Sequence, residues 1–240
     1  MNKLDKYKEW LVYNDTTEQF CVKTFDHINA EAPPNFFGHD FFYKEIYDFE
    51  FSETSCIYER HECVLNEDDV VVDLGAHVGF FTNYAASKCK KVIAVEGSSE
   101  YFSCLVKNTT LEHHNVEYLH ANVVSEQNSI SRSWGRCPSK FNVTLKQIFE
   151  IYNLETIDFL KVDIEGSEYS IFKELDVNIL SKIKKIALES HPKQAPFLNF
   201  NEVNPNACLI EYLRSKKAFG FNWHFFNNKN VQEMFYFTSK

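Results

Sequence analysis

From Asp69 onward, short apolar runs alternate with stretches of helical periodicity. Such runs are typical of buried strands, and their alternation with helical stretches is typical of βαβ units that build a parallel sheet. The pattern predicts strands at Val70–Leu74, Lys91–Val95, Val116–His120, Phe159–Val162 and Lys185–Leu188. It predicts helices near Phe80–Lys88, Ser99–Leu111, Thr144–Tyr152 and Glu168–Leu175.

The pattern changes after Asn204. A helical stretch to Lys217 is followed by two aromatic runs, Phe221–Phe226 and Gln232–Phe237, with a polar segment between them. Two apolar runs around a short polar segment are typical of an antiparallel hairpin. We therefore expect an α/β fold: a mostly parallel sheet with helices on both faces and a terminal antiparallel hairpin.

The chain before Glu67 reads as an N-terminal extension to a core domain. Phe41–Phe51 and Ser55–His61 are rich in Phe, Tyr and Ile on either side of a polar pair, which predicts a β-hairpin or two edge strands. A length of 240 residues fits one hydrophobic core. We predict an extension over residues 1–67, as a substrate cover or edge strands, and a catalytic domain over residues 68–240.

Composition narrows the classes of partner. A net charge of -9 disfavours nucleic acid, because its phosphates repel an acidic surface. No apolar window or N-terminal leader predicts a membrane span or export, so we expect a cytoplasmic protein. The seven cysteines form no C-x-x-C pair, which favours reduced thiols over disulfides or zinc. The 23 phenylalanines leave room for a homodimer patch.

A glycine-containing turn follows the first predicted strand. Asp73, Gly75 and Gly79 give the spacing D-x-G-x-x-x-G between that strand and a helix. Glycine in such a turn lets the backbone approach a ligand closely. The spacing lacks the further glycine with which the dinucleotide fingerprint G-x-G-x-x-G accommodates a pyrophosphate, so we expect a ligand without one.

Polar residues also end the next two strands. Glu96 follows the second strand, where a carboxylate can accept hydrogen bonds from both hydroxyls of a ribose. Asn122 follows the third strand, where its amide can pair with the edge of an adenine ring. The alternatives are a helix cap for Glu96 and a plain strand-end position for Asn122.

Ionisable side chains gather at the ends of the fourth and fifth strands. Asp163, Glu165 and Glu168 lie close together, and like charges repel unless a cation, a ligand or a helix N-terminus offsets them. Glu189 and His191 are two residues apart, so their side chains point the same way from an extended backbone. A histidine can take a proton from an incoming hydroxyl. We therefore expect a catalytic crevice here, with His191 as base or bystander and Glu168 as helix cap or site residue.

Together these segments resemble the FkbM-type family of class I S-adenosylmethionine-dependent methyltransferases. The family pattern D-x-G-A-N-x-G reads Asp73–Gly79 here, its E-P reads Glu96–Gly97, and its K-x-D-x-E-G-x-E reads Lys161–Glu168. Two positions depart from the pattern, since His77 replaces the usual Asn and Gly97 the usual Pro.

The resemblance covers residues 55–191 and implies a seven-stranded sheet, S-adenosylmethionine as donor, and methyl transfer to a hydroxyl of a sugar, glycan or other small metabolite. The residues it implies for donor binding are Asp73, Gly75, Ala76, His77, Gly79, Phe80, Glu96, Gly97, Asn122, Val123 and Asp163. The expected catalytic residues are Asp163, Glu165, Glu189 and His191.

Other functions stay open. An RNA ribose 2′-O-methyltransferase also uses lysine and acidic residues at sheet ends, but the acidic balance disfavours it. The missing glycine disfavours an NAD-dependent oxidoreductase, and the cofactor-site carboxylates disfavour a non-catalytic module. Oxygen ligands from Asp163, Glu165 and Glu189 would suit Mg²⁺, although the prediction assigns no residue to a metal.

Overall fold

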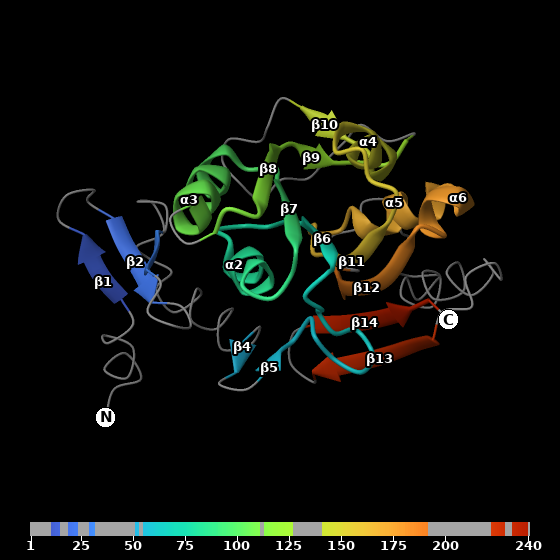
Figure 1. Ribbon diagram of the computed structural model, residues 1–240, viewed down its shortest axis with the longest axis horizontal. Helices are drawn as coiled ribbons and strands as arrows, with labels where there is room; N and C mark the ends of the chain where they lie inside the picture. The colour runs from blue at the N-terminus through green and yellow to red at the C-terminus, as the bar shows by residue number, and fades with distance from the viewer. Residues whose placement is uncertain are drawn as a thin grey trace, which may run out of the picture.

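The computed structural model describes residues 11–14, 19–23, 29–31, 51–52, 55–110, 113–126, 141–191, 222–228 and 232–239. Its centre is a seven-stranded sheet in the order β13-β14-β12-β11-β6-β7-β8. In chain order these strands are β6 (Val70–Leu74), β7 (Lys91–Glu96), β8 (Val116–His120), β11 (Ile157–Val162), β12 (Ile183–Ser190), β13 (Asn222–Asn228) and β14 (Gln232–Thr238). Figure 1 shows β14 and β13 beyond β12 at one edge of the sheet.

The direction of the strands confirms the predicted architecture. Strand β14 runs antiparallel to both of its neighbours, so six strands share one direction and one is reversed. Strands β6 and β8 have the predicted bounds, whereas β7, β11 and β12 are longer than predicted. The mostly parallel sheet and the terminal hairpin are therefore as the sequence predicts.

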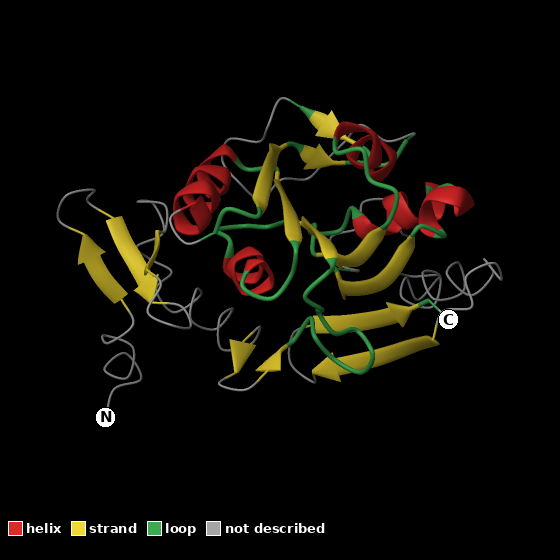
Figure 2. Cartoon of the chain, viewed as in Figure 1, coloured by secondary structure: helices red, strands yellow, loops and turns green. Residues whose placement is uncertain are grey.

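Helices cover both faces of the sheet, as Figure 2 shows. They are α2 (Phe80–Ala86), α3 (Ser99–Thr110), α4 (Leu145–Ile151), α5 (Glu168–Glu174) and α6 (Val177–Leu180). Apolar residues of α4, α5 and α6 pack in one core cluster, and those of α2 pack in another on the opposite face. Neighbouring strand residues alternate between the clusters, with Val71 and Phe159 in one and Val72 and Leu160 in the other. Burial on both faces explains the consecutive apolar residues in these strands.

The extension contains more strand than the sequence pattern predicts. Strands β1 (Leu11–Asn14), β2 (Gln19–Lys23) and β3 (Asn29–Glu31) form an antiparallel sheet that was not predicted. The short strands β4 (Phe51–Ser52) and β5 (Ser55–Cys56) form an antiparallel pair. Another short pair, β9 (Asn122–Val123) and β10 (Asn142–Val143), is parallel and was not predicted.

The predicted strand over Ser55–His61 is wrong beyond Cys56. The Glu59 N–H donates to the Cys56 carbonyl at 3.0 Å and closes a turn. Ile57 and Tyr58 lie in that turn and are buried in a core cluster. The aromatic run at 41–50 and the helical stretch at 204–217 lie outside the described residues. Among the described helices, none has the length and apolar character needed to cross a membrane.

Candidate functional site

The turn after β6 lies directly against the end of β11. Gly75 has a left-handed φ of 78°, and a Cβ at this position would lie 1.8 Å from the Asp163 carbonyl oxygen. Only glycine fits, because it has no Cβ and adopts positive φ without cost. His77 is also left-handed, with φ 53°, in a region where Asn, Asp and His are the most tolerated non-glycine residues. A shared backbone preference therefore explains why His77 can replace the Asn of the family pattern.

Glu96 joins this turn to the loop after β7. One carboxylate oxygen accepts the His77 N–H at 2.8 Å, and the other accepts the Ser98 N–H at 2.6 Å. Burial raises the pKa of Glu96, and the two N–H groups act against that rise. Each carboxylate oxygen has a further lone pair, so the group retains capacity for ligand hydroxyls.

Gly97 and Asn122 approach each other closely. A Cβ on Gly97 would lie 2.6 Å from the Asn122 side-chain oxygen, which explains a glycine here in place of the family's proline. The Asn122 amide donates to the Phe141 carbonyl at 3.3 Å and to the Asn142 side chain at 3.0 Å. In the structure this side chain therefore joins β9 to β10, an arrangement that strand-end placement alone did not predict.

Three residues predicted to contact the donor are held inside the protein. Asp73 is fully buried, accepts a hydrogen bond from Thr82 at 2.6 Å and forms an ion pair with a lysine. The side chains of Phe80 and Val123 belong to the two core clusters. In this structure the side chains of Asp73, Phe80 and Val123 thus pack beneath the site, inside the protein.

The lysine is Lys161, to which sequence reasoning gave no role. Its side chain is buried, and its ammonium donates to the Gly75 carbonyl at 2.7 Å. The same nitrogen lies 3.2 Å from the Asp73 carboxylate and 3.5 Å from that of Asp163. Its place in the K-x-D-x-E-G motif was the available signal, since a charged residue inside an apolar strand needs buried partners.

The predicted catalytic residues do come together. We use the name acidic cluster for Asp163, Glu165, Glu168, Glu189 and His191. One imidazole nitrogen of His191, Nδ1, lies 2.6 Å from Glu168, and the other, Nε2, lies 3.2 Å from Glu189. Asp163 and Glu165 each lie 3.7 Å from Nε2. Four carboxylates therefore surround one histidine ring.

The environment shifts the ionisation of these groups. Burial acts to lower the pKa of His191, but Glu168 and Glu189 outweigh it and hold that pKa well above the ordinary value. Burial raises the pKa of Glu165 to about 7 and also raises that of Glu189. Burial acts to raise the pKa of Asp163 as well, but Lys161 and His191 outweigh it and lower that pKa. With its proton held between carboxylates, His191 resembles a cation more than a free base.

A residue outside the predicted site completes the cluster. The Tyr58 hydroxyl lies 3.1 Å from an oxygen of Asp163 and 3.1 Å from an oxygen of Glu189, and the Tyr58 side chain is fully buried. The Lys161 ammonium lies 5.2 Å from the centre of its ring. Nothing in the local sequence distinguishes Tyr58 from its aromatic neighbours, because its partners lie more than 100 residues further along the chain.

The donor atoms of the cluster suit a cation. One atom each from Asp163, Glu189 and His191 lie within 4.8 Å of one another. Carboxylate oxygens and an imidazole nitrogen are common ligands of divalent metal ions. Glu165, which we named with Asp163 and Glu189 as a source of Mg²⁺ ligands, is not in this set, and His191 takes its place.

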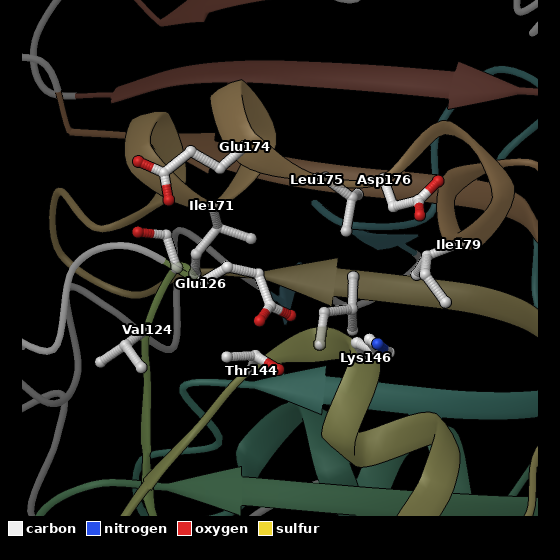
Figure 3. Close-up of a pocket in the computed structure, with 11 residues that line it drawn as sticks. Val124, Glu126, Thr144, Lys146, Ile171, Glu174, Leu175, Asp176 and Ile179 are labelled. Carbon is white, nitrogen blue, oxygen red and sulfur yellow. The ribbon is translucent and has the colours of Figure 1, made fainter.

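A separate cavity of about 200 Å³ lies away from these residues. Figure 3 shows its lining, which comes from the chain around Val124, from the start of α4 and from α5 and α6. None of the predicted site residues lines this cavity. The candidate site is therefore the edge of the sheet where β6, β7, β11 and β12 end.

Comparisons with known proteins bear on the family and the fold. The model of the methyltransferase FkbM domain matches residues 73–222, more than half of the chain. No match was found among curated proteins. A methyltransferase FkbM from Methylobacillus flagellatus has a similar structure, with TM-score 0.51 and 17% identity over 72% of this chain and 44% of that one. An rRNA methylase from Streptococcus thermophilus gives TM-score 0.48 and 13% identity over 73% of this chain and 89% of that one. From the family match, the chain belongs to the FkbM methyltransferase family.

Proposed function

We propose that this protein transfers a methyl group from S-adenosylmethionine to a hydroxyl of a sugar, glycan or other small metabolite. The observation that carries the proposal is the contact between the donor-side turn and the acidic cluster. Through Lys161, the Gly75 carbonyl and the Asp163 carboxylate share one ammonium group. A donor on the turn and an acceptor at the cluster would thus be neighbours, and alignment of two reactants supplies much of the catalysis in a displacement.

The chemistry of the turn fits this donor. Glu96 offers hydrogen-bond acceptors to the two hydroxyls of a ribose, and Asp163 offers a negative charge to an ammonium group. Between them the backbone at Gly75, Ala76, His77 and Gly79 would hold the amino-acid end. Asn122 and Val123 would lie beside the adenine, with the Val123 backbone as the contact because its side chain is in the core.

The acceptor side is the acidic cluster. S-adenosylmethionine supplies an electrophilic methyl group, and its sulfur keeps the electron pair of the broken C–S bond. Glu189 and His191 would orient the acceptor hydroxyl by hydrogen bonds. The O–H proton would pass to a side chain of the cluster as the oxygen forms its bond to carbon. Polar groups on several sides of the cluster suit a hydroxylated acceptor, and the net charge of -9 disfavours RNA.

Calorimetric titration tests the donor. S-adenosylhomocysteine is expected to bind the purified chain, and NADH is not. Glu96→Gln should weaken that binding about tenfold or more, because a charge-assisted hydrogen bond contributes about 1.5–3 kcal/mol. Glu150→Gln, an exposed position on α4, is the matched control and should bind as the wild type does.

The outcomes separate the candidate functions. No binding of S-adenosylhomocysteine to a folded wild-type chain would overturn the proposal, and binding of NADH instead would favour the oxidoreductase. If the donor product binds, methyl incorporation from labelled S-adenosylmethionine into sugars, and separately into RNA, tests the acceptor class. Labelling of RNA alone would overturn the small-molecule assignment.

A further inference from the structure

Two carboxylates and an imidazole converge at the ends of β11 and β12 with the spacing of a metal site. The donor atoms of Asp163, Glu189 and His191 lie within 4.8 Å of one another. Ligand atoms at about 2.1 Å from one ion are at most about 4.2 Å apart, so small side-chain rotations would close the set around an ion. The donor set is mixed, because it includes a nitrogen ligand as well as carboxylate oxygens.

A residue outside that set orients the histidine. Glu168 is fully buried, and its carboxylate lies 2.6 Å from His191 Nδ1. This contact turns the other nitrogen, Nε2, toward Glu189 at 3.2 Å and Asp163 at 3.7 Å. Histidines that bind metals almost always donate their second N–H to a carboxylate, a carbonyl or water in this way. The position of Glu168 is therefore that of the outer partner of a histidine ligand.

The acidic cluster has more carboxylates than cationic partners, which favours the binding of a divalent cation. Asp163, Glu165, Glu168 and Glu189 surround His191, and the only other cation paired with them in the described part of the chain is Lys161. A single N–H at Nε2 faces three carboxylates and can be donated to one of them. The second oxygen of Glu168 is buried without a hydrogen-bond partner among the described residues. We infer that Asp163, Glu189 and His191 bind a divalent metal ion, with Mn²⁺ as a representative, and that Glu168 holds His191 in place for it.

The catalytic role of the ion rests on the proposed function and deepens it. Glu189 and His191 would then hold the acceptor hydroxyl through the ion in place of direct hydrogen bonds. Bound to the hydroxyl oxygen of the acceptor, a divalent cation lowers the pKa of that hydroxyl. The O–H bond then breaks with its proton passing to Glu165, which lies outside the ligand set beside Nε2. The freed electron pair on oxygen would form the new bond to the methyl carbon as the C–S bond breaks and the sulfur keeps its electron pair. Binding of the ion to Nε2 would displace the proton on that nitrogen, which would be released to solvent, because a histidine ligand must be neutral. Metal binding itself needs neither donor nor acceptor, so the site can be tested alone.

The test is a titration of the chelator-treated full chain with Mn²⁺, followed by the electron paramagnetic resonance signal of the free ion. One ion per chain is expected. Asp163→Asn and Glu189→Gln each remove a ligand charge and should lower the affinity more than tenfold. Glu168→Gln should lower it by about 10–100-fold through the orientation of His191. Glu150→Gln is the matched control and should bind as the wild type does.

A wild-type chain that binds no Mn²⁺, or variants that bind it with unchanged affinity, would overturn the inference. If one of the ligand variants does not fold, Glu168→Gln and the Mn²⁺-induced rise in the wild-type melting temperature still decide it. Titration with S-adenosylhomocysteine is independent of these results. Mn²⁺ bound at this site without S-adenosylhomocysteine binding would contradict the proposed function and leave the metal site standing.

Discussion

The Lys161 ammonium donates a 2.7 Å hydrogen bond to the Gly75 carbonyl oxygen. This bond joins the turn after β6 to the strand that carries the acidic cluster. The same ammonium lies within 3.5 Å of Asp73 and Asp163 and over the Tyr58 ring. One buried cation thus holds together groups from both sides of the proposed reaction.

Replacement of Lys161 should therefore destabilise the fold and the donor site together. Lys161→Met keeps most of the side-chain volume but leaves the Asp73 carboxylate buried without its cation. Removal of one partner of a buried ion pair lowers stability by about 3–5 kcal/mol. We expect urea unfolding to show a loss of about that size. Lys173→Met, at an exposed position on α5, should stay close to the wild type, and an equal loss in both variants would refute a special role for Lys161.

The close approach of the turn to β11 gives a second prediction, for glycine replacements. Gly75→Ala would place a methyl group 1.8 Å from the Asp163 carbonyl oxygen, and its left-handed backbone alone costs alanine about 1–2 kcal/mol. At Gly97 the added group would meet the Asn122 side chain at 2.6 Å, and a side chain can move aside more readily than a backbone. Thermal unfolding should therefore show a larger loss for Gly75→Ala than for Gly97→Ala. The reverse order would contradict this account of the turn.

The sequence predicted the fold better than the details of the site. Strand β6 was predicted with its observed bounds because it is buried and begins with a continuous apolar run, as strands covered on both faces of a sheet do. Strand β8 was also predicted with its observed bounds, although its residues are only partly buried or exposed. The sequence pattern missed the sheet β1-β2-β3. Its strands are short, lie within polar sequence and show no clear alternation of apolar and polar residues. The segment after Cys56 was misread for a different reason. Its apolar residues are buried in a turn, and the sequence pattern of a buried turn does not differ from that of a buried strand.

Within the site, strand-end position predicted which carboxylates meet but not what they contact. Asp163, Glu165, Glu189 and His191 gather as predicted because parallel strands end at one edge. The partner of Asp163 and Glu189 across the cluster is Tyr58, which comes from a turn that precedes the matched domain. Only tertiary packing brings that turn to the sheet, so no local sequence motif predicts the contact of Tyr58 with the cluster.

Tyr58→Phe tests this contact with the removal of a single oxygen atom. The hydroxyl is buried between two carboxylates, so its loss deprives them of a charge-assisted hydrogen bond and should lower the free energy of unfolding by about 2 kcal/mol. Tyr118→Phe is the comparison, because its hydroxyl pairs with the neutral Thr109 hydroxyl at 2.7 Å. Urea unfolding should show the larger loss for Tyr58→Phe. Equal losses would mean that the carboxylates do not depend on the Tyr58 hydroxyl.

The start of β11 carries an ion pair whose effect on stability should depend on pH. Asp158 accepts the Val70 N–H at 2.8 Å and pairs with the Lys184 ammonium at 2.5 Å. Burial acts to raise the pKa of Asp158, but these two donors outweigh it and hold that pKa below its ordinary value. A carboxyl group whose pKa is lower in the folded chain than in the unfolded one contributes its full stabilisation above the unfolded pKa of about 4 and loses it as the pH falls through the folded pKa.

The size of this contribution is limited because the Lys184 side chain is more than half exposed, which leaves under about 1 kcal/mol after solvent screening. We therefore expect the free energy of unfolding of the wild type to fall slightly more between about pH 5 and about pH 2 than that of Asp158→Asn, which has no carboxyl group to titrate there. Other carboxylates titrate in the same range, so the difference between the two curves is the quantity to measure by urea unfolding at each pH. Asp68→Asn, at an exposed position, should follow the wild type. Parallel curves for the wild type and Asp158→Asn would show that the Lys184 pair contributes nothing to stability.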